Sequence, residues 1–209
     1  MKSFNKKYWD KFYKKKNLTV RPSKFSKFVL KKIKNKSLII YDLGSGNGRD
    51  TIFFKKNKIN CFGLERSKIG IKETKKKYKK YAKNFINTDF CKFFKNKKIK
   101  SEFGLYSRFT LHTINYANEK LFFQAIKKQK KLKYVFIETR TIQDDYYGIG
   151  EKVGKHEFIS SHYRRFIDPK EIKKKLQKFL KIIYFKKSKN FAKFKKENPM
   201  ILRIIAKKI

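Results

Sequence analysis

Hydrophobic residues follow two alternating patterns along this chain. Short, continuous apolar runs predict buried strands, and segments with an apolar residue at every third or fourth position predict amphipathic helices. Strands are predicted near 38–43, 59–64, 84–87, 102–107, 132–139, 181–186 and 200–206, and helices over 4–16, 22–33, 50–56, 67–80, 118–131 and 168–180. Strands that alternate with helices indicate a parallel sheet with helices on both faces.

The last two predicted strands have no crossover helix between them, so they should form an antiparallel hairpin. The predicted fold class is therefore α/β: a seven-stranded, mostly parallel sheet with an antiparallel last hairpin and helices on both faces. A chain of 209 residues is long enough for one domain with a buried core, so residues 1–209 are predicted to form a single domain. Ligands of such sheets bind beyond the carboxyl ends of the strands.

The net charge of +43 suggests a nucleic-acid partner, because lysines that neutralise phosphates drive association. Only eight of the 59 basic residues are arginine, which leaves 59 − 8 = 51 lysines, and these are spread over the whole chain. Arginine is the better donor to phosphate and base edges. We therefore prefer the interpretation that the lysines form a solvated coat, typical of an AT-rich genome, and keep nucleic acid as the alternative partner.

Other features place the protein in the cytoplasm. The N-terminus lacks the apolar run of a signal peptide, and the longest apolar stretches have the length of a strand, so no membrane span is predicted. Cys61 and Cys91 are isolated and lack metal-ligand spacing, so we predict no metal site.

A glycine-rich loop follows the first predicted strand, in the stretch DLGSGNG. Its glycines allow a sharp turn and leave room for a ligand close to the backbone. Glu65 ends the next strand, where a carboxylate can accept hydrogen bonds from both hydroxyls of a ribose. A dinucleotide and S-adenosylmethionine (SAM) both suit this arrangement, but a dinucleotide loop usually has a third glycine where this chain has Arg49.

DLGSGNG resembles motif I of class I SAM-dependent methyltransferases. Glu65 and the run Thr88-Asp89-Phe90 match the places where that family holds the ribose and the adenine, so the resemblance spans residues 38–139 and extends to the C-terminus through the seven-strand pattern. It implies SAM as the cofactor and residues 1–36 as a helical lid over it. The implied cofactor-binding residues are Tyr8, Trp9, Arg21, Asp42, Gly44, Ser45, Gly46, Gly48, Glu65, Arg66, Asp89, Phe90 and Ser107.

In this family the end of the fourth strand lies beside the transferable methyl group. That end reads YSRFTLHT here, so the resemblance implies Arg108 and His112 as catalytic residues. His112 is a candidate proton acceptor because an unperturbed histidine titrates near neutrality. The alternative is that His112 packs structurally in the following turn.

Residues 140–168 follow the fifth strand and differ in composition from the rest of the chain. They are rich in acids, glycines, tyrosines and arginines, and the segment is long for a plain connection. We interpret it as a substrate-binding insertion, the alternative being a solvated connection. The candidate substrate-binding residues are Arg140, Asp144, Tyr146, His156, Arg164 and Arg165.

The runs SRFTLH, ETRTIQDDYYGIGEKVG and HYRRF are similar to methyltransferases of bacterial surface-glycan and capsule gene clusters. This similarity implies methyl transfer to O or N of a small polar or anionic acceptor, such as a sugar or a phosphorylated metabolite. Two alternatives remain. One is an RNA methyltransferase that uses the basic surface, although the chain lacks an appended RNA-binding domain and an N-P-P-[YF] motif. The other is a non-enzymatic SAM-binding scaffold or sensor.

Overall fold

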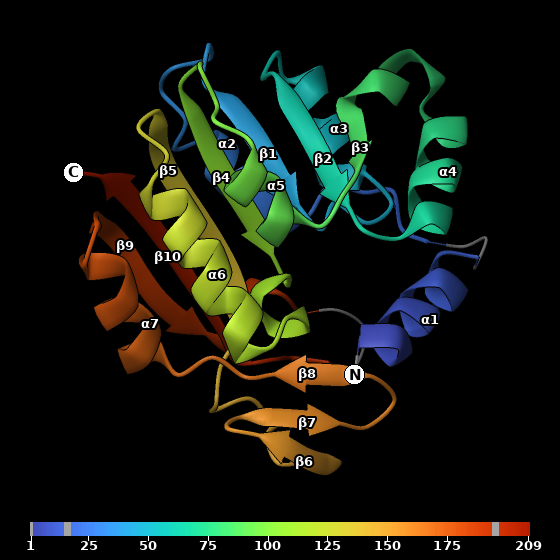
Figure 1. Ribbon diagram of the computed structural model, residues 1–209, viewed down its shortest axis with the longest axis vertical. Helices are drawn as coiled ribbons and strands as arrows, with labels where there is room; N and C mark the ends of the chain where they lie inside the picture. The colour runs from blue at the N-terminus through green and yellow to red at the C-terminus, as the bar shows by residue number, and fades with distance from the viewer. Residues whose placement is uncertain (1, 15–17, 194–196) are drawn as a thin grey trace.

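The computed structural model describes residues 2–14, 18–193 and 197–209. Its main sheet has seven strands in the order β3-β2-β1-β4-β5-β10-β9 (Figure 1). The first five strands along the chain pair in parallel, and β10 runs antiparallel to both of its neighbours, β5 and β9. The predicted fold class, including the antiparallel final pair, is confirmed. The strands of this sheet are β1 (Ile39–Leu43), β2 (Cys61–Glu65), β3 (Phe85–Asn87), β4 (Phe103–Arg108), β5 (Leu132–Arg140), β9 (Leu180–Ser188) and β10 (Ile201–Lys208).

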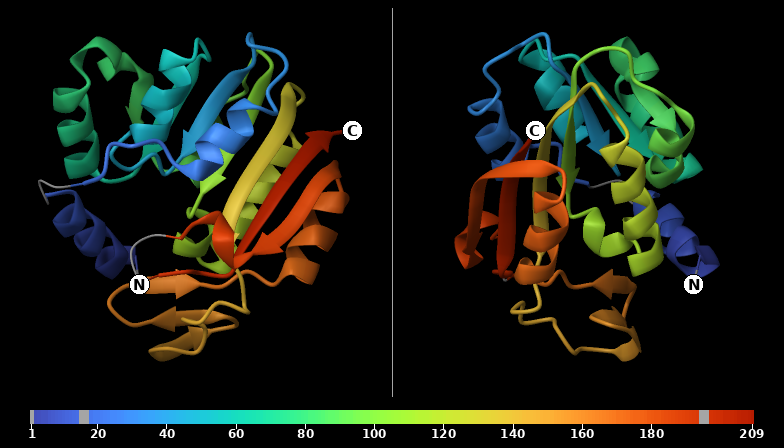
Figure 2. Two further views of the ribbon diagram at one scale, coloured as in Figure 1. Left: turned by 180° about the vertical axis from the view of Figure 1, so that it is seen from behind. Right: turned by 60° about the vertical axis from the view of Figure 1, so that its left-hand side comes forward.

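Helices cover both faces of the sheet (Figures 1 and 2). On one face Phe94, Phe122 and Leu176 join a single apolar core, and on the other Phe25 and Phe54 join a second core. The α-helices are α1 (Lys2–Tyr13), α2 (Lys24–Leu30), α3 (Arg49–Lys56), α4 (Lys68–Lys77), α5 (Phe90–Asn96), α6 (Tyr116–Lys127) and α7 (Pro169–Gln177). Short 3-10 turns occupy η1 (Lys79–Asn84), η2 (Leu111–Thr113) and η3 (Lys189–Phe191). None of the helices in the described ranges is long and apolar enough to cross a membrane.

Helix α5 has no counterpart in the predicted elements. It begins directly after the third strand, because the Asp89 carboxylate accepts a hydrogen bond from the backbone N–H of Cys91 at 2.9 Å and caps the helix. Its seven residues place Phe90 and Phe94 against the core. A helix this short shows too few turns for its apolar period to stand out in the sequence.

The segment after β5 forms a separate three-stranded antiparallel sheet, which the sequence patterns did not predict. Its strands are β6 (Glu151–Gly154), β7 (Glu157–Ile159) and β8 (Tyr163–Arg165). Figure 1 shows this small sheet beyond the carboxyl end of the parallel strands, with α1 lying at the same edge. Strands of three or four residues are too short for an alternation of apolar and polar residues to be recognised.

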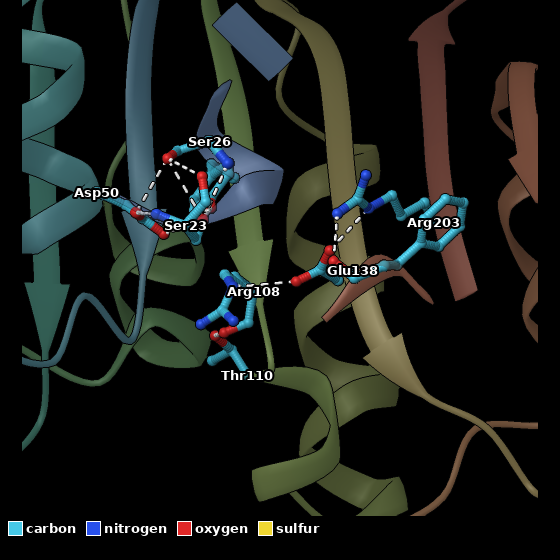
Figure 3. Close-up of polar contacts among 9 residues, drawn as sticks. Ser23, Ser26, Asp50, Arg108, Thr110, Glu138 and Arg203 are labelled. Carbon is cyan, nitrogen blue, oxygen red and sulfur yellow. Dashed lines mark hydrogen bonds and ion pairs between the residues drawn. The ribbon is translucent and has the colours of Figure 1, made fainter. Parts of the chain in front are cut away.

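A buried carboxylate joins α2 to α3. Asp50 accepts hydrogen bonds from the backbone N–H and hydroxyl of Ser23, both at 2.8 Å, from the Ser26 hydroxyl at 3.0 Å and from the Tyr106 hydroxyl at 2.7 Å. Figure 3 shows the two serines, Ser26 in α2 and Ser23 just before it, facing Asp50. Ser23 is also the N-cap of α2, since its side chain accepts from the backbone N–H of Ser26. This network fixes the segment that leads from α1 into the sheet.

We expect Ser23→Ala to lower the free energy of unfolding by about 1–2 kcal/mol, because it removes both the helix cap and a hydrogen bond to a buried carboxylate. Urea unfolding followed by circular dichroism measures this loss. Ser37→Ala is the control, because Ser37 is exposed and its hydroxyl contacts only Asn35. Equal midpoints for the two variants would contradict a structural role for this network.

Candidate functional site

A cavity of about 340 Å³ opens at the carboxyl ends of β1, β2 and β4. It lies between the glycine-rich loop, the start of α5, the turn after β4 and the end of α1. Its lining residues are Trp9, Phe12, Tyr13, Leu18, Thr19, Asp42, Gly44, Ser45, Gly46, Asn47, Arg49, Asp50, Leu64, Glu65, Arg66, Ser67, Asp89, Phe90, Arg108, Phe109, Thr110, Thr113 and Ile114. The cavity therefore joins the ends of several strands, as expected for a ligand site in an α/β sheet.

The glycine-rich loop forms one wall of the cavity. Gly46 has a φ of +58°, and a Cβ added there would lie 3.1 Å from the Tyr13 hydroxyl oxygen. Gly48 is the N-cap of α3 with a φ of +75°, and its Cβ would lie 2.7 Å from the Phe85 ring. Both positions therefore require glycine for backbone conformation and for space. Gly44 and Gly46 line the cavity. Gly48 shapes the loop but does not line the cavity.

Glu65 ends β2 and is held rigidly at the cavity wall. One carboxylate oxygen accepts from the backbone N–H of Gly46 at 3.1 Å and from the Tyr13 hydroxyl at 3.4 Å, and the other accepts from the backbone N–H of Ser67 at 2.8 Å. Burial raises the pKa of Glu65, while the N–H donors of Ser67 and Gly46 act in the opposite direction. The hydrogen bond from the Tyr13 hydroxyl is long, so the Glu65 oxygen that accepts it can still accept a hydrogen bond from a ligand. Such a carboxylate fits the hydroxyls of a ribose.

Two further acids line the same cavity. Asp42, in β1, accepts a hydrogen bond from the Thr51 hydroxyl at 2.7 Å, and burial together with the negative charge of Asp50 raises the pKa of Asp42 to about 7. Asp89, at the end of β3, lies beside the ring of Phe90. A carboxylate next to an apolar ring fits an adenine, which offers an amino donor and a flat face.

Two arginines lie at the end of the cavity near α3. Arg49 is the first residue of α3, and Arg108 is the last residue of β4. The Arg108 Nε donates to Glu138 at 3.0 Å, and the Nε of Arg203 donates to the other oxygen of the same carboxylate at 2.7 Å (Figure 3). Burial and the positive charge of Arg108 lower the pKa of Arg49.

Phe109 has an unusual backbone at the end of β4, with a φ of +54°. A bulky residue rarely adopts this conformation, and such strain concentrates at functional sites. The guanidinium of Arg108 lies 4.5 Å from the centroid of the Phe109 ring, and the His112 ring centroid lies 5.4 Å from it. Phe109 therefore lines the cavity and also contacts His112, which does not line it.

The predicted residues His112 and Ser107 are buried and do not line the cavity. Within the described parts of the chain the His112 Nδ1 has no hydrogen-bond partner. Burial, together with the positive charges of Arg140 and Arg164, lowers the pKa of His112 well below its usual value. The imidazole is therefore neutral at physiological pH.

The predicted substrate residues lie in or beside the small sheet, and none of them lines the cavity. Arg140 pairs with Asp144 at 2.9 Å and with Glu197 at 2.6 Å, and the guanidinium groups of Arg140 and Arg164 lie 5.1 and 5.5 Å from the centroid of the Tyr146 ring. Arg140, Asp144, Tyr146 and Arg164 thus form one cluster. His156 and Arg165 are not part of it.

Arg165 is buried and holds the small sheet to the main domain. It pairs with Glu119 of α6 and donates to the backbone oxygen of Ile114 at 3.0 Å. His156 has a φ of +60° and contacts the Tyr147 hydroxyl at 2.8 Å. The contacts with Glu119 and Ile114 give Arg165 a structural role that its position in the sequence did not reveal.

Helix α1 spans the distance between the cavity and the small sheet. Trp9 and Tyr13 line the cavity, while Tyr8 stacks on His162 with ring centroids 4.4 Å apart. Burial lowers the pKa of His162 to about 4, so this stack involves a neutral imidazole. Arg21 is exposed and lies outside the cavity. Residues 15–17, within the predicted first helix and lid, are outside the described residues.

Several lining residues escaped the sequence-based selection. Thr110 and Thr19 carry no recognisable motif, and Tyr13 falls in the predicted lid without a motif of its own. Arg49 had a usable signal, because it is one of only eight arginines and directly follows the glycine-rich loop. Position alone did not tell whether its side chain would face the ligand or the solvent.

No protein-family model matches this sequence, and no curated protein is similar to it. Solved structures do share its fold. A SAM-dependent methyltransferase from Methanosarcina mazei has a TM-score of 0.71 at 13% identity, covering 87% of this chain and 97% of that one. One from Archaeoglobus fulgidus has a TM-score of 0.64 at 17% identity, covering 88% and 92%. The glycopeptide N-methyltransferase MtfA, complexed with S-adenosylhomocysteine, has a TM-score of 0.64 at 12% identity, covering 90% of each chain. This chain therefore has the class I SAM-dependent methyltransferase fold.

Proposed function

We propose that the protein is a SAM-dependent methyltransferase that moves a methyl group to O or N of a small polar or anionic acceptor. One observation carries the proposal: a single cavity joins the glycine-rich loop, Glu65, and the pair Asp89 and Phe90, at the ends of three neighbouring strands. The similarity in fold to the SAM-dependent methyltransferases from Archaeoglobus fulgidus and Methanosarcina mazei agrees with this proposal.

The residues of the cavity form three groups, and each group fits a different part of an S-adenosyl ligand. Glu65 would accept hydrogen bonds from the ribose hydroxyls, and Asp89 and Phe90 would hold the adenine. Gly44 and Gly46 leave room for the ligand against the backbone, next to Ser45, Asp42 and Arg66. When bound, SAM supplies a methyl group that its sulfonium already activates. The protein's task is then to orient the acceptor and exclude water.

Helix α1 is proposed as a lid over this site. Its Trp9 and Tyr13 reach the cavity, and Asp10 accepts a hydrogen bond from the Ser67 hydroxyl at 2.5 Å at the start of α4. Tyr8 connects the same helix to the small sheet. Tyr13 contacts Glu65 and lines the same cavity, so a ligand bound at Glu65 would lie next to α1.

The acceptor would lie between the cavity and the insertion of residues 140–168. The cluster of Arg140, Asp144, Tyr146 and Arg164 suits a polar or anionic molecule, because guanidinium groups bind carboxylates and phosphates. A sugar or phosphorylated metabolite of the surface-glycan type, handled in the cytoplasm, is the proposed class. His112 remains a candidate base because it is neutral. His112 does not line the cavity, so to use it the acceptor must reach beyond the cavity's lining residues.

Titration of the protein with S-adenosylhomocysteine by calorimetry tests this proposal. We expect one saturable site, and a loss of affinity of about ten-fold or more in Glu65→Gln, because a charge-assisted hydrogen bond is removed. Glu73→Gln is the matched control, since Glu73 is exposed on α4. A folded wild-type protein that gives no binding heat, or equal affinities in both variants, would refute the assigned site.

A further inference from the structure

Two guanidinium groups meet at the α3 end of the cavity. Arg49 comes from the first turn of α3, and Arg108 comes from the end of β4, which pairs in parallel with β1 just before the glycine-rich loop. Both side chains are partly buried and both line the cavity. Burial and the positive charge of Arg108 lower the pKa of Arg49, so this guanidinium lies in a desolvated place close to a second positive charge.

The carboxylates around these arginines do not balance their charge. Glu138 is shared by Arg108 and Arg203, so one negative charge serves two positive ones. Arg108 uses its Nε for this contact, and Figure 3 shows the far end of its guanidinium pointing toward Thr110 and away from Glu138. Thr110 and Arg108 both line the cavity, and among the described residues the terminal nitrogens of Arg108 have no hydrogen-bond acceptor.

Arg49 has no carboxylate of its own. In the described ranges of the chain no acid lies within ion-pair distance of it. The nearby Asp50 is already hydrogen-bonded to Ser23, Ser26 and Tyr106. Asp42 is half protonated near neutral pH. Hydrogen bonds from neutral donors do not remove the charge of Asp50, so this end holds the guanidinium groups of Arg49, Arg108 and Arg203 against the carboxylates of Glu138 and Asp50 and a partly protonated Asp42, and it keeps a small excess of positive charge.

Arg66 provides a contrast at the other end of the same cavity. Its positive charge acts on Glu65, which lines the cavity beside it. Arg66 thus has an acidic neighbour on the cavity wall, although no ion pair joins the two side chains among the described residues, whereas Arg49 and Arg108 lie near each other's positive charge. Unmatched guanidinium groups in a partly buried site indicate an anionic ligand group.

We propose that Arg49 and Arg108 together bind one carboxylate- or phosphate-sized anion at the α3 end of the cavity. The anion has two possible sources: the amino-acid carboxylate of the S-adenosyl ligand, or an acidic group on the acceptor. The identity of these two molecules rests on the proposed function. The binding of an anion rests on the two arginines alone.

Calorimetry with two nucleosides separates the sources. S-adenosylhomocysteine carries the carboxylate, and 5′-methylthioadenosine lacks the whole amino-acid part. If the cofactor supplies the anion, Arg49→Gln and Arg108→Gln each weaken S-adenosylhomocysteine about ten-fold and leave 5′-methylthioadenosine unchanged. Lys56→Gln removes one charge from the exposed side of α3 and serves as the matched control. Arg108→Lys retains the charge without the fork and should recover part of the affinity.

A second arm detects an acceptor anion. Inorganic phosphate is titrated against the protein saturated with S-adenosylhomocysteine, and thermal unfolding reports the stabilisation. If the acceptor supplies the anion, phosphate stabilises the wild type and Lys56→Gln but not Arg49→Gln, while affinity for S-adenosylhomocysteine stays unchanged. Arg49→Gln leaves Glu138 paired, so it keeps the fold. Variants that match the wild type with both nucleosides and with phosphate would overturn the proposal.

The two proposals fail in different ways. A wild type that binds neither nucleoside contradicts the proposed function. In that case phosphate is titrated without a nucleoside into the wild type and into Arg49→Gln, and the two results are compared. Loss of the phosphate effect in Arg49→Gln supports the anion site, and an equal effect in both proteins removes it.

Discussion

Replacing Glu138 with alanine should lower the free energy of unfolding by about 3–5 kcal/mol, because removal of one partner of a buried ion pair leaves charge without compensation. The Glu138 side chain is 1% exposed, and it pairs with Arg108 and Arg203, which are 21% and 7% exposed. Among the described residues, Arg203 would retain the backbone oxygen of Phe191, at 3.0 Å, as its one hydrogen-bond acceptor. The loss should be among the largest for any single substitution in the sheet.

Urea unfolding at neutral pH measures this effect as a lower midpoint at an unchanged slope. Glu138→Gln retains most of the side-chain volume, so comparing the two variants separates the lost charge from the cavity. Glu102→Ala is the surface control, because the Glu102–Lys133 pair is 46% and 42% exposed and should contribute about 1 kcal/mol or less. If Glu138→Ala cost no more than Glu102→Ala, the row of Arg108, Glu138 and Arg203 would not stabilise the fold.

Asp42 should make the ligand-free protein less stable as the pH rises. The pKa of Asp42 is about 7 in the folded protein, raised by burial and by Asp50, against an ordinary value of 3.8. Between these values the folded state holds a proton that the unfolded state has lost. Stability attributable to this proton is complete below about pH 4 and is lost as the pH rises to about 7. The total is on the order of 4 kcal/mol.

Asp42→Asn should abolish this dependence, because an amide resembles the protonated acid and still accepts from Thr51. Chemical unfolding at intervals from pH 4 to pH 8 tests it. The variant and the wild type should have similar stability near pH 4, and the variant should be the more stable of the two at pH 8. Parallel curves over the whole range would show that Asp42 is charged throughout.

The positions of the sheet's strands were predictable because each parallel strand is a continuous apolar run, and the antiparallel final pair was predictable because it lacked a crossover helix. The start of α7 was also predictable, since Asp168 and Pro169 form a recognisable helix beginning. Residues 151–165 were not, because strands of three or four residues have no measurable period and depend on tertiary contacts such as the pair of Arg165 with Glu119.

The candidate site divides in the same way. Gly44, Gly46, Glu65, Asp89 and Phe90 follow strand ends, so the topology alone placed them together, and they share one cavity. The side chains of the insertion depend on how that segment folds back, which sequence patterns do not specify. The roles of Arg140, Asp144, Tyr146, His156, Arg164 and Arg165 in binding an acceptor therefore remain predictions.

Methyl transfer from labelled SAM to a pool of cell metabolites tests the central claim most directly. The protein is incubated with isotopically labelled SAM and a metabolite extract, and the products are identified by mass spectrometry. We predict label in a small polar or anionic compound with the wild type, and about ten-fold less or none with Glu65→Ala, since that variant should bind the cofactor poorly. A folded protein that binds SAM and labels nothing would contradict enzymatic activity and favour a scaffold, and label found only in RNA would contradict a small acceptor.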